Sequence, residues 1–210
     1  MPQGAAIALS QEVPPLCEDD LDPDPLAQFQ RWFAEAAALP LAEAAALATA
    51  SADARPSARM VLVKGWDATG FVFYSNYESR KGGELTANPH AALLFYWQPL
   101  GRQVRIEGSV QPIAAQESDG YFAARPRASQ ISAAASAQSR VVADRQELDD
   151  RVGELERALG DEPVLRPPWW GGYRLDPINF EFWQHRQDRL HDRIRYLRSA
   201  SGWHRERLQP

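Results

Sequence analysis

The sequence lacks the features by which several classes of protein are recognised. A single cysteine, Cys17, excludes an intrachain disulfide and suits a reducing cytoplasm. No stretch approaches about 20 uninterrupted apolar residues, and no basic residues precede an early apolar run, so we expect neither a membrane span nor a secretory signal. A net charge of −5 argues against general nucleic-acid binding, which normally requires a basic protein surface. We therefore expect a cytoplasmic protein that binds neither membranes nor nucleic acids.

Several catalytic motifs are missing as well. The chain has no glycine-rich nucleotide fingerprint, no phosphate-binding loop, and no Cys-x-x-Cys or His-x-x-x-His pair. Its four histidines make a zinc site hard to assemble, and no serine stands in a recognisable nucleophile elbow. We expect no metal site, so the candidate chemistry is left to cationic and hydrogen-bonding side chains.

Charge is distributed unevenly along the chain. Residues 1–30 contain carboxylates but no lysine or arginine, whereas arginines crowd residues 186–207. Because residues 1–23 are also rich in proline and show no periodicity, we interpret them as a flexible acidic arm. Lysine occurs only as Lys64 and Lys81 among 23 basic residues, and an ammonium is not equivalent to a guanidinium at an anion site. The two lysines are candidates for a special role, and a random bias in composition is the alternative.

Residues 24–210 alternate between strand and helix signals, and we expect them to form one domain. Asp24 before Pro25 marks a helix start, since apolar residues follow at helical spacing. The alanine-rich segment 41–56 fits a helix or a strand. Short apolar runs bounded by turn residues predict strands over 57–65, 71–76, 91–97, 102–110, 178–183, 192–198 and 202–210.

Helices are predicted between the two groups of strands. Ser79 can cap a short helix that Pro89 ends, and residues 114–126, 128–139 and 144–160 favour further helices. The last helix carries an apolar stripe formed by Leu148, Val152, Leu155 and Leu159. Strands, then helices, then strands that complete the sheet predict an α+β protein, mainly β, built on an antiparallel barrel or sandwich.

The first cationic cluster is drawn from two segments that precede the C-terminal strands. Ser79, Arg80 and Lys81 open a helix, where free backbone N–H groups and two cations can hold a phosphate; a solvated helix start is the alternative. Arg59 and Lys64 bracket an apolar strand and can reach an anion from its ends.

A second candidate anion site lies in the predicted helical region. Tyr121, Arg125 and Ser129 are spaced four apart, which places them on one helical face unless Pro126 breaks the helix. An ordinary exposed polar face is the alternative.

The segment "RLHDR" at 189–193 forms the third cluster. If it is a strand, Arg189, His191 and Arg193 line one face, and these groups repel one another unless an anion lies against them. Three separate cationic clusters in an acidic chain favour a site for two phosphorylated small molecules.

The longer segment "FEFWQHRQDRLHDR" resembles the signature of the pyridoxamine 5′-phosphate oxidase family. That signature has an aromatic-rich strand, Trp-Gln, four variable residues and Arg-Leu-His-Asp-Arg. The resemblance runs from about Asp24 to Pro210 and includes "RMVLVK", "FYSNYESRK", "RQVRIEG", "YFAARPRASQI", "QS", "WGGYR" and "RLQP". It implies an FMN-binding split β-barrel of the antiparallel Greek-key type with flanking helices, over a single domain that includes C-terminal dimerisation strands. It also implies a homodimer with FMN at the subunit interface.

The resemblance further implies an activity and a set of site residues. The activity is the FMN-dependent oxidation of pyridoxamine 5′-phosphate and pyridoxine 5′-phosphate to pyridoxal 5′-phosphate, with O2 as acceptor and H2O2 as product. The implied FMN contacts are Arg59, Met60, Val61, Leu62, Val63, Lys64, Tyr74, Ser75, Arg80, Lys81, Gln103, Gln138, Ser139, Trp183 and Arg193. The implied substrate contacts are Lys64, Tyr121, Arg125, Ser129, Arg189 and His191, and the last two are the implied catalytic residues.

The chain departs from the family pattern in two places. Family members often carry an Arg and a Tyr in an N-terminal arm that closes over the substrate, whereas the first Arg here is Arg31 and the first Tyr is Tyr74. Ala134 also replaces a tryptophan of the family's "IGAWAS". Two alternatives therefore stay open: a phenazine-biosynthesis type of FMN oxidase, and a non-catalytic protein that binds FMN or pyridoxal phosphate.

Overall fold

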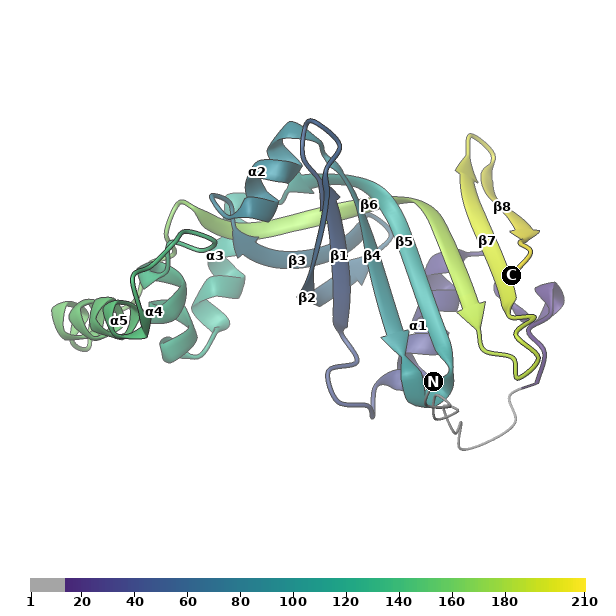
Figure 1. Cartoon of the computed structure of the whole chain (residues 1–210), viewed down its shortest axis with the longest axis horizontal. Coiled ribbons are helices and arrows are strands. Elements are labelled where there is room, and N and C mark those ends of the chain that lie inside the picture. Colours follow the sequence, from purple (N-terminus) through teal and green to yellow (C-terminus); the bar gives the residue numbers. More distant parts are fainter. Residues whose placement is uncertain (1–13) are drawn as a thin grey trace, which may run out of the picture.

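Six antiparallel strands close into a barrel in the computed structural model, which describes residues 14–210. The strand order is β3-β2-β1-β4-β5-β6, and β6 pairs again with β3 (Figure 1). The barrel strands are β1 (Ala44–Ala50), β2 (Pro56–Asp67), β3 (Gly70–Asn76), β4 (His90–Trp97), β5 (Arg102–Pro112) and β6 (Trp170–Gln184). The predicted strands are confirmed, and of the two predicted architectures the barrel is correct.

The long strand β6 joins the barrel to a C-terminal extension. Its first half pairs with β3, its second half pairs with β7 (Asp192–Ser199), and β5 runs along nearly all of it. Strand β8 (Gly202–Arg207) then pairs with β7, and we call these two strands the C-terminal ribbon. A bulge beside Gly108 lets β6 bend between its two halves, and a Cβ at Gly108 would lie 2.0 Å from the carbonyl oxygen of Asp176.

Helix α1 (Pro25–Ala36) packs against the interior of the barrel. Asp24 caps it by accepting a hydrogen bond from the N–H of Leu26, as the sequence predicts. The fully buried ring of Phe29 lies 4.9 Å from that of Phe71 and 5.0 Å from that of Phe95, measured between centroids. Aromatic packing therefore holds the helix to the sheet.

The ambiguous alanine-rich segment contains strand β1. Alternate residues of β1, Ala45, Leu47 and Thr49, are buried, and the strand pairs with β2 on one side and β4 on the other. Alanine favours helix intrinsically, but two neighbouring strands satisfy the backbone of β1, and this tertiary context decides the outcome.

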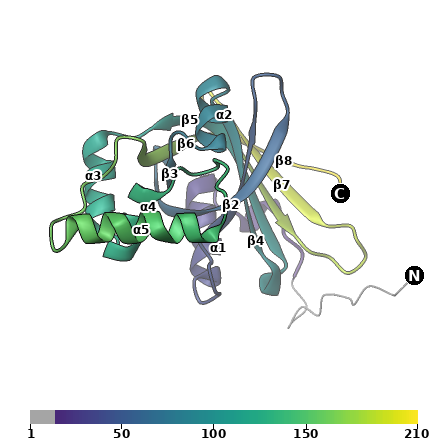
Figure 2. The same ribbon diagram turned by 60° about the vertical axis from the view of Figure 1, so that its left-hand side comes forward.

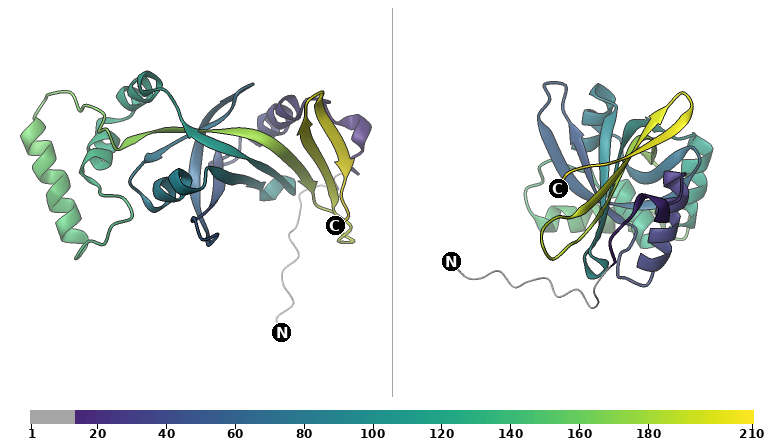
Figure 3. Two further views of the ribbon diagram at one scale, coloured as in Figure 1. Left: turned by 90° about the horizontal axis from the view of Figure 1, so that it is seen from above. Right: turned by 90° about the vertical axis from the view of Figure 1, so that its right-hand side faces the viewer.

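The remaining helices are α2 (Arg80–Ala87), α3 (Ala115–Ala124), α4 (Arg127–Ala135) and α5 (Arg145–Leu159), with short 3₁₀ turns at Glu18–Asp20 and Gln98–Leu100. Helices α3 to α5 form a group beside β3 and β6 (Figure 2), at the opposite end of the molecule from the C-terminal ribbon (Figure 3). This group has its own apolar cluster, built on Phe122, Ile131 and Trp170 and covered by the predicted α5 stripe. No helix in residues 14–210 has the length and apolarity needed to cross a membrane.

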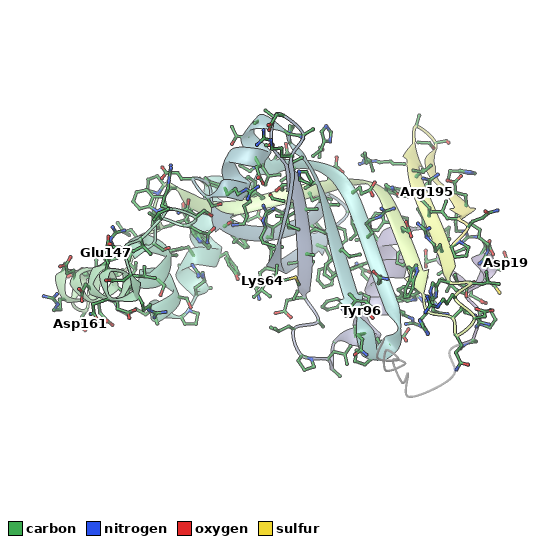
Figure 4. All side chains as sticks on the ribbon, viewed as in Figure 1. Asp19, Lys64, Tyr96, Glu147, Asp161 and Arg195 are labelled. Atoms are coloured by element: carbon green, nitrogen blue, oxygen red, sulfur yellow. The ribbon has the colours of Figure 1, made fainter. Side chains whose placement is uncertain are left out.

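Residues 14–23 differ from the predicted flexible arm. They lie beside the C-terminal ribbon, where Leu16 and Leu21 join the core and Figure 4 labels Asp19 and Arg195 at one end of the molecule. The guanidinium of Arg207 forms an ion pair with Glu18 at 2.8 Å and donates to the carbonyl oxygen of Leu16. The arm therefore does not extend to residue 23, because its carboxylates and leucines find partners in distant strands; residues 1–13 lie outside the described part of the chain.

Candidate active site

A buried lysine stands at the start of α2. Ser79 caps this helix, and the Lys81 side chain is only 9% exposed. Its Nζ atom donates to Oγ of Ser75 at 2.9 Å and to Oε1 of Gln138 at 2.7 Å, so its described hydrogen-bond partners are neutral oxygens. Burial lowers the pKa of Lys81 to about 8. A buried ammonium without a carboxylate in hydrogen-bond contact fits the binding of an anion.

Two further predicted residues lie near Lys81. Arg59 on β2 and Arg80 on α2 both contact the carboxylate of Glu84, one turn into the helix. Ser139 follows Gln138 in the connection between α4 and α5 and adopts a left-handed backbone conformation with φ of 71°. The structure thus brings Arg59, Arg80 and Lys81 together, although they come from two elements.

The other predicted FMN contacts on strand β2 alternate between its two faces. Met60 and Leu62 point outward and are exposed, whereas the Val63 side chain is 1% exposed within the barrel core. The Val63 side chain therefore cannot touch a ligand, and a contact there is limited to the backbone. Lys64 forms an ion pair with Glu43 at 3.2 Å.

A second group of predicted residues lines a separate cavity of about 210 Å³. Gln103, Trp183 and Arg193 line it together with Leu94, Arg105 and Glu181. Gln103 faces Tyr96 across the strands, and Figure 4 labels Tyr96 at the opposite end of the barrel from α2. Within one chain, the predicted FMN contacts therefore fall into two groups in different places.

A cavity of about 540 Å³ lies between α4, α5 and Trp170. Arg125 and Ser129 line it, and the Arg125 guanidinium carbon lies 4.7 Å from the Trp170 ring centroid. The Nη1 atom of Arg125 is buried without a hydrogen-bond partner among the described residues, and burial lowers the pKa of this guanidinium. Since an unpaired buried cation is costly, this atom points to an anionic ligand.

Of the two possibilities for Tyr121, Arg125 and Ser129, one continuous helical face or a break at Pro126, the structure has the break. Helix α3 ends at Ala124 and α4 begins at Arg127, because Pro126 cannot continue the hydrogen-bond ladder. Tyr121 nevertheless stays near, since its ring stacks on Tyr74 at 3.8 Å and lies parallel to Trp170. The three side chains are brought together by packing around Trp170, while Lys64 does not line this cavity.

The strand considered for Arg189, His191 and Arg193 forms only at Arg193. Strand β6 ends at Gln184 and β7 begins at Asp192, so Arg189 and His191 lie in the connecting turn. Arg189 has a left-handed backbone with φ of 65°, which breaks the alternation of side chains that a strand requires. The three groups therefore do not form a row on one face.

Four of the five arginines of the C-terminal ribbon are neutralised by carboxylates of the protein itself, and the fifth, Arg205, donates to the carbonyl oxygen of Leu21. The ion pairs are Arg193–Glu181, Arg195–Glu206, Arg198–Asp176, Arg207–Glu18 and Arg207–Asp192. The premise that a bound anion must compensate this ribbon is therefore wrong. By contrast, the Arg189 guanidinium makes no hydrogen bond or ion pair within residues 14–210.

His191 is oriented by its neighbours in the turn. Its Nδ1 atom accepts a hydrogen bond from the backbone N–H of Arg186 at 3.0 Å, and its ring centroid lies 4.6 Å from that of Trp183. Burial, and then the nearby His185, lowers the pKa of His191. A neutral His191 thus keeps its proton on Nε2, where it can donate to a ligand.

Three residues that contribute to these groups were not singled out from the sequence. Glu84 and Glu181 are buried carboxylates that each hold two arginines, and Trp170 supports the Arg125 guanidinium. The only sequence signal for Glu181 is an acidic residue between two phenylalanines of an apolar strand. Glu84 has no such signal, because a glutamate in a short helix is ordinary.

Comparison with known proteins gives consistent matches along the chain. Residues 34–157 match the family model described as pyridoxamine 5′-phosphate oxidase, and residues 170–210 match that of the pyridoxine 5′-phosphate oxidase C-terminal dimerisation region. Pyridoxine/pyridoxamine 5′-phosphate oxidase from Rubrobacter xylanophilus is 57% identical over 93% of this chain and 91% of its own length. The protein of the same name from Cupriavidus taiwanensis is 56% identical over 93% of both chains.

Solved structures agree with the fold. PhzG from Burkholderia lata 383, in complex with tetrahydrophenazine-1-carboxylic acid, is 38% identical with a TM-score of 0.87, over 94% of this chain and 99% of its own. A pyridoxamine 5′-phosphate oxidase-related, FMN binding protein from Nostoc punctiforme is 18% identical with a TM-score of 0.73, over 88% of this chain and 96% of its own. The second likeness shows the fold alone. The split-barrel prediction is confirmed by these structures.

Proposed function

The chain belongs to the pyridoxamine 5′-phosphate oxidase family, and from this premise we propose that it oxidises pyridoxamine and pyridoxine 5′-phosphate to pyridoxal 5′-phosphate. The enzyme depends on FMN, passes electrons to O2 and releases H2O2. The observation that carries the substrate class is the buried, unpaired Nη1 of Arg125 in the 540 Å³ cavity, because it requires an anion such as a phosphate. The identity of 57% with an oxidase of this name supports the same choice.

The residues at the start of α2 fit the phosphate of FMN. The buried Lys81 ammonium is held by neutral oxygens of Ser75 and Gln138, and the helix start adds free N–H groups. Gln103, Trp183 and Arg193 offer hydrogen bonds, a ring and a cation for the remainder of the cofactor. When bound, FMN supplies the redox chemistry by accepting a hydride from the substrate and returning electrons to O2.

A homodimer reconciles the two separate groups of FMN contacts. The group around Lys81 in one subunit would meet the group around Trp183 in its partner. Exposed apolar side chains on β2 and β4 support this arrangement, since Met60 and Leu62 of β2 and Tyr96 of β4 are exposed, as in an uncovered interface. Residues 170–210, which include the C-terminal ribbon, match a dimerisation region, and this match supports a homodimer.

The substrate would lie between the Arg125 cavity and the β6–β7 turn of the partner. Arg125, Ser129 and Tyr121 would bind its phosphate, with Lys64 at the edge of the same site. Arg189 would orient the pyridine ring and assist proton movement at C4′. His191 would donate a hydrogen bond from Nε2, because its Nδ1 is already occupied.

The proposal also covers the domain organisation of the chain and its compartment. Residues 24–210 would fold as one domain, since β6 takes part in both the barrel and the C-terminal ribbon. The cytoplasm is the compartment that fits a chain with a single cysteine, which excludes an intrachain disulfide.

FMN affinity should fall as the pH rises above 8. The pKa of Lys81 is about 8, so the ligand-free protein carries an ammonium below this pH and a neutral amine above it. Since the phosphate of FMN is a dianion throughout this range, binding above pH 8 requires Lys81 to take up a proton, and Kd should rise by about tenfold per pH unit. Fluorescence titrations between pH 7 and 9 measure this slope. Riboflavin, which has no phosphate, should show a flat profile, and an equal slope for riboflavin would contradict the assignment.

The activity is tested by adding pyridoxine 5′-phosphate to the FMN-loaded protein in air. We expect release of H2O2 together with the absorbance of pyridoxal 5′-phosphate. Binding without peroxide would favour a non-catalytic carrier, whereas oxidation of a dihydrophenazine but not of the B6 substrate would favour a phenazine-type oxidase. A purified protein that is colourless and does not take up FMN would contradict the proposed oxidase, the phenazine-type oxidase and a carrier of FMN.

A further inference from the structure

A buried carboxylate lies among the cations at the start of α2. Glu84 is 7% exposed and sits one turn after Arg80 in the same helix. Its Oε2 accepts hydrogen bonds from Oγ1 of Thr49 at 2.5 Å, Oγ of Ser57 at 2.6 Å and Nη2 of Arg59 at 3.1 Å. Its Oε1 accepts from Nε of Arg80 at 2.8 Å. Both oxygens of Glu84 therefore accept hydrogen bonds, and three of the four go to Oε2.

These contacts keep Glu84 ionised. Burial by itself raises the pKa of the carboxyl group, but the hydrogen bonds from Ser57, Thr49, Arg80 and Arg59 outweigh it and lower the pKa to about 2. A permanent negative charge thus lies beside the group that we assign to the FMN phosphate. By Coulomb's law alone this charge weakens the binding of a phosphate, so its presence there calls for a compensating role.

The compensating role of Glu84 follows from its bonds to Arg59 and Arg80. Arg59 projects from β2 and Arg80 from α2, and the Arg80 side chain is largely exposed, so nothing else in its helix orders it. Glu84 ties both guanidiniums to one point, and Arg59 is also held by Thr49 and by the carbonyl oxygen of Leu47. Guanidiniums held in advance lose less conformational entropy when an anion binds.

We propose that Glu84 is a positioning residue of the FMN phosphate site, which holds Arg59 and Arg80 in place for the phosphate. This inference rests on the proposed function, because it takes the group around Lys81 as the phosphate site. Glu84 itself does not touch the cofactor in this proposal. Its contribution is the prior ordering of two cations from separate elements.

The variant Glu84→Gln separates positioning from charge, because the two predict opposite signs. Loss of positioning weakens FMN binding, and we expect Kd to rise on the order of 10-fold to 100-fold, as for lost hydrogen bonds to charged groups. Simple removal of a negative charge strengthens it. The readout is the Kd of FMN and of riboflavin for the ligand-free protein, measured by quenching of flavin fluorescence. Riboflavin affinity should stay unchanged, since a general loss of structure would weaken both ligands alike.

A matched control is Glu78→Gln, which removes the same charge from an exposed position just before Ser79. FMN affinity in this variant should be unchanged or slightly higher. If Glu84→Gln does not fold, Ser57→Ala replaces it, since Ser57 bonds to both Glu84 and Arg59 at a half-buried position. We expect a smaller loss there, about threefold, again confined to FMN.

The wild type is titrated alongside these variants. An unchanged or tighter FMN Kd in Glu84→Gln, or an unchanged ratio of the two flavins in Ser57→Ala, would overturn the positioning role while the proposed function stands. A wild type that binds no FMN would overturn the proposed function and the positioning role with it.

Discussion

Replacing Arg125 with methionine is expected to lower kcat/KM for pyridoxine 5′-phosphate by about 100-fold to 1000-fold and to raise the melting temperature of the ligand-free protein. The two effects share one cause. The Nη1 atom of Arg125 is buried without a partner among residues 14–210, and the guanidinium lies over the Trp170 ring. A phosphate dianion would supply the missing partner, so the arginine stabilises the complex at the cost of the free protein. Methionine fills similar volume without a charge to desolvate.

Steady-state kinetics and thermal denaturation without ligand measure the two effects. The control is Arg157→Met, because Arg157 lies on the exposed side of α5 and, among residues 14–210, bonds only to the carbonyl oxygen of Gly153 in its own helix. It should leave kcat/KM and the melting temperature nearly unchanged. A lower melting temperature in Arg125→Met would show that the guanidinium has a structural partner and would remove the argument for an anion in this cavity.

Replacing Arg189 with asparagine is expected to lower kcat by about 100-fold and to leave the Kd of FMN unchanged. The arginines of the C-terminal ribbon bond to carboxylates or carbonyl oxygens, whereas the guanidinium of Arg189, in the turn before the ribbon, makes no such contact within the described residues. It is therefore available to a substrate. Asparagine is chosen because it tolerates the left-handed backbone of position 189 better than most residues, so the turn should persist.

Two comparisons test this assignment. Arg189→Lys keeps the charge but not the planar fork, and should recover only part of the lost turnover. Arg198→Gln removes a paired arginine of the same ribbon and should leave kcat unchanged, since Arg198 bonds to Asp176 far from the turn. If Arg189→Asn loses FMN as readily as it loses turnover, the residue belongs to the cofactor site and not to the substrate.

The departures from the family pattern bear on closure of the site. Residues 14–23 are tied to the C-terminal ribbon through Glu18 and Leu16, and Gln184 donates to the carbonyl oxygen of Pro14 at 2.7 Å. Pro14, the first described residue, therefore lies beside the end of β6, which leads into the turn that carries Arg189. Residues 1–13 contain neither Arg nor Tyr, and their structure lies outside the described range.

The parts of the fold that the sequence predicts well are those set by neighbouring residues. Ser79 and Asp24 cap their helices because a short polar side chain reaches the N–H groups two or three positions on. The apolar runs of β2 to β5 form strands because turn residues bound them. The sequence left open a helix through Arg125 and a strand through Arg189, and neither element is continuous, because a proline interrupts the first and a left-handed residue the second.

The sequence by itself determined the strands other than β1, the helix starts and the kinds of side chain available for binding phosphates, since these depend on propensity and spacing over a few residues. Only the tertiary structure decided which charges are free. Glu18 and Arg207 are 189 positions apart and still neutralise each other, whereas Arg125 and Lys81 are buried without a carboxylate in contact among the described residues. The physical reason is that a charge is compensated by whatever folds against it, and that partner is set by the closure of the barrel and not by distance along the chain.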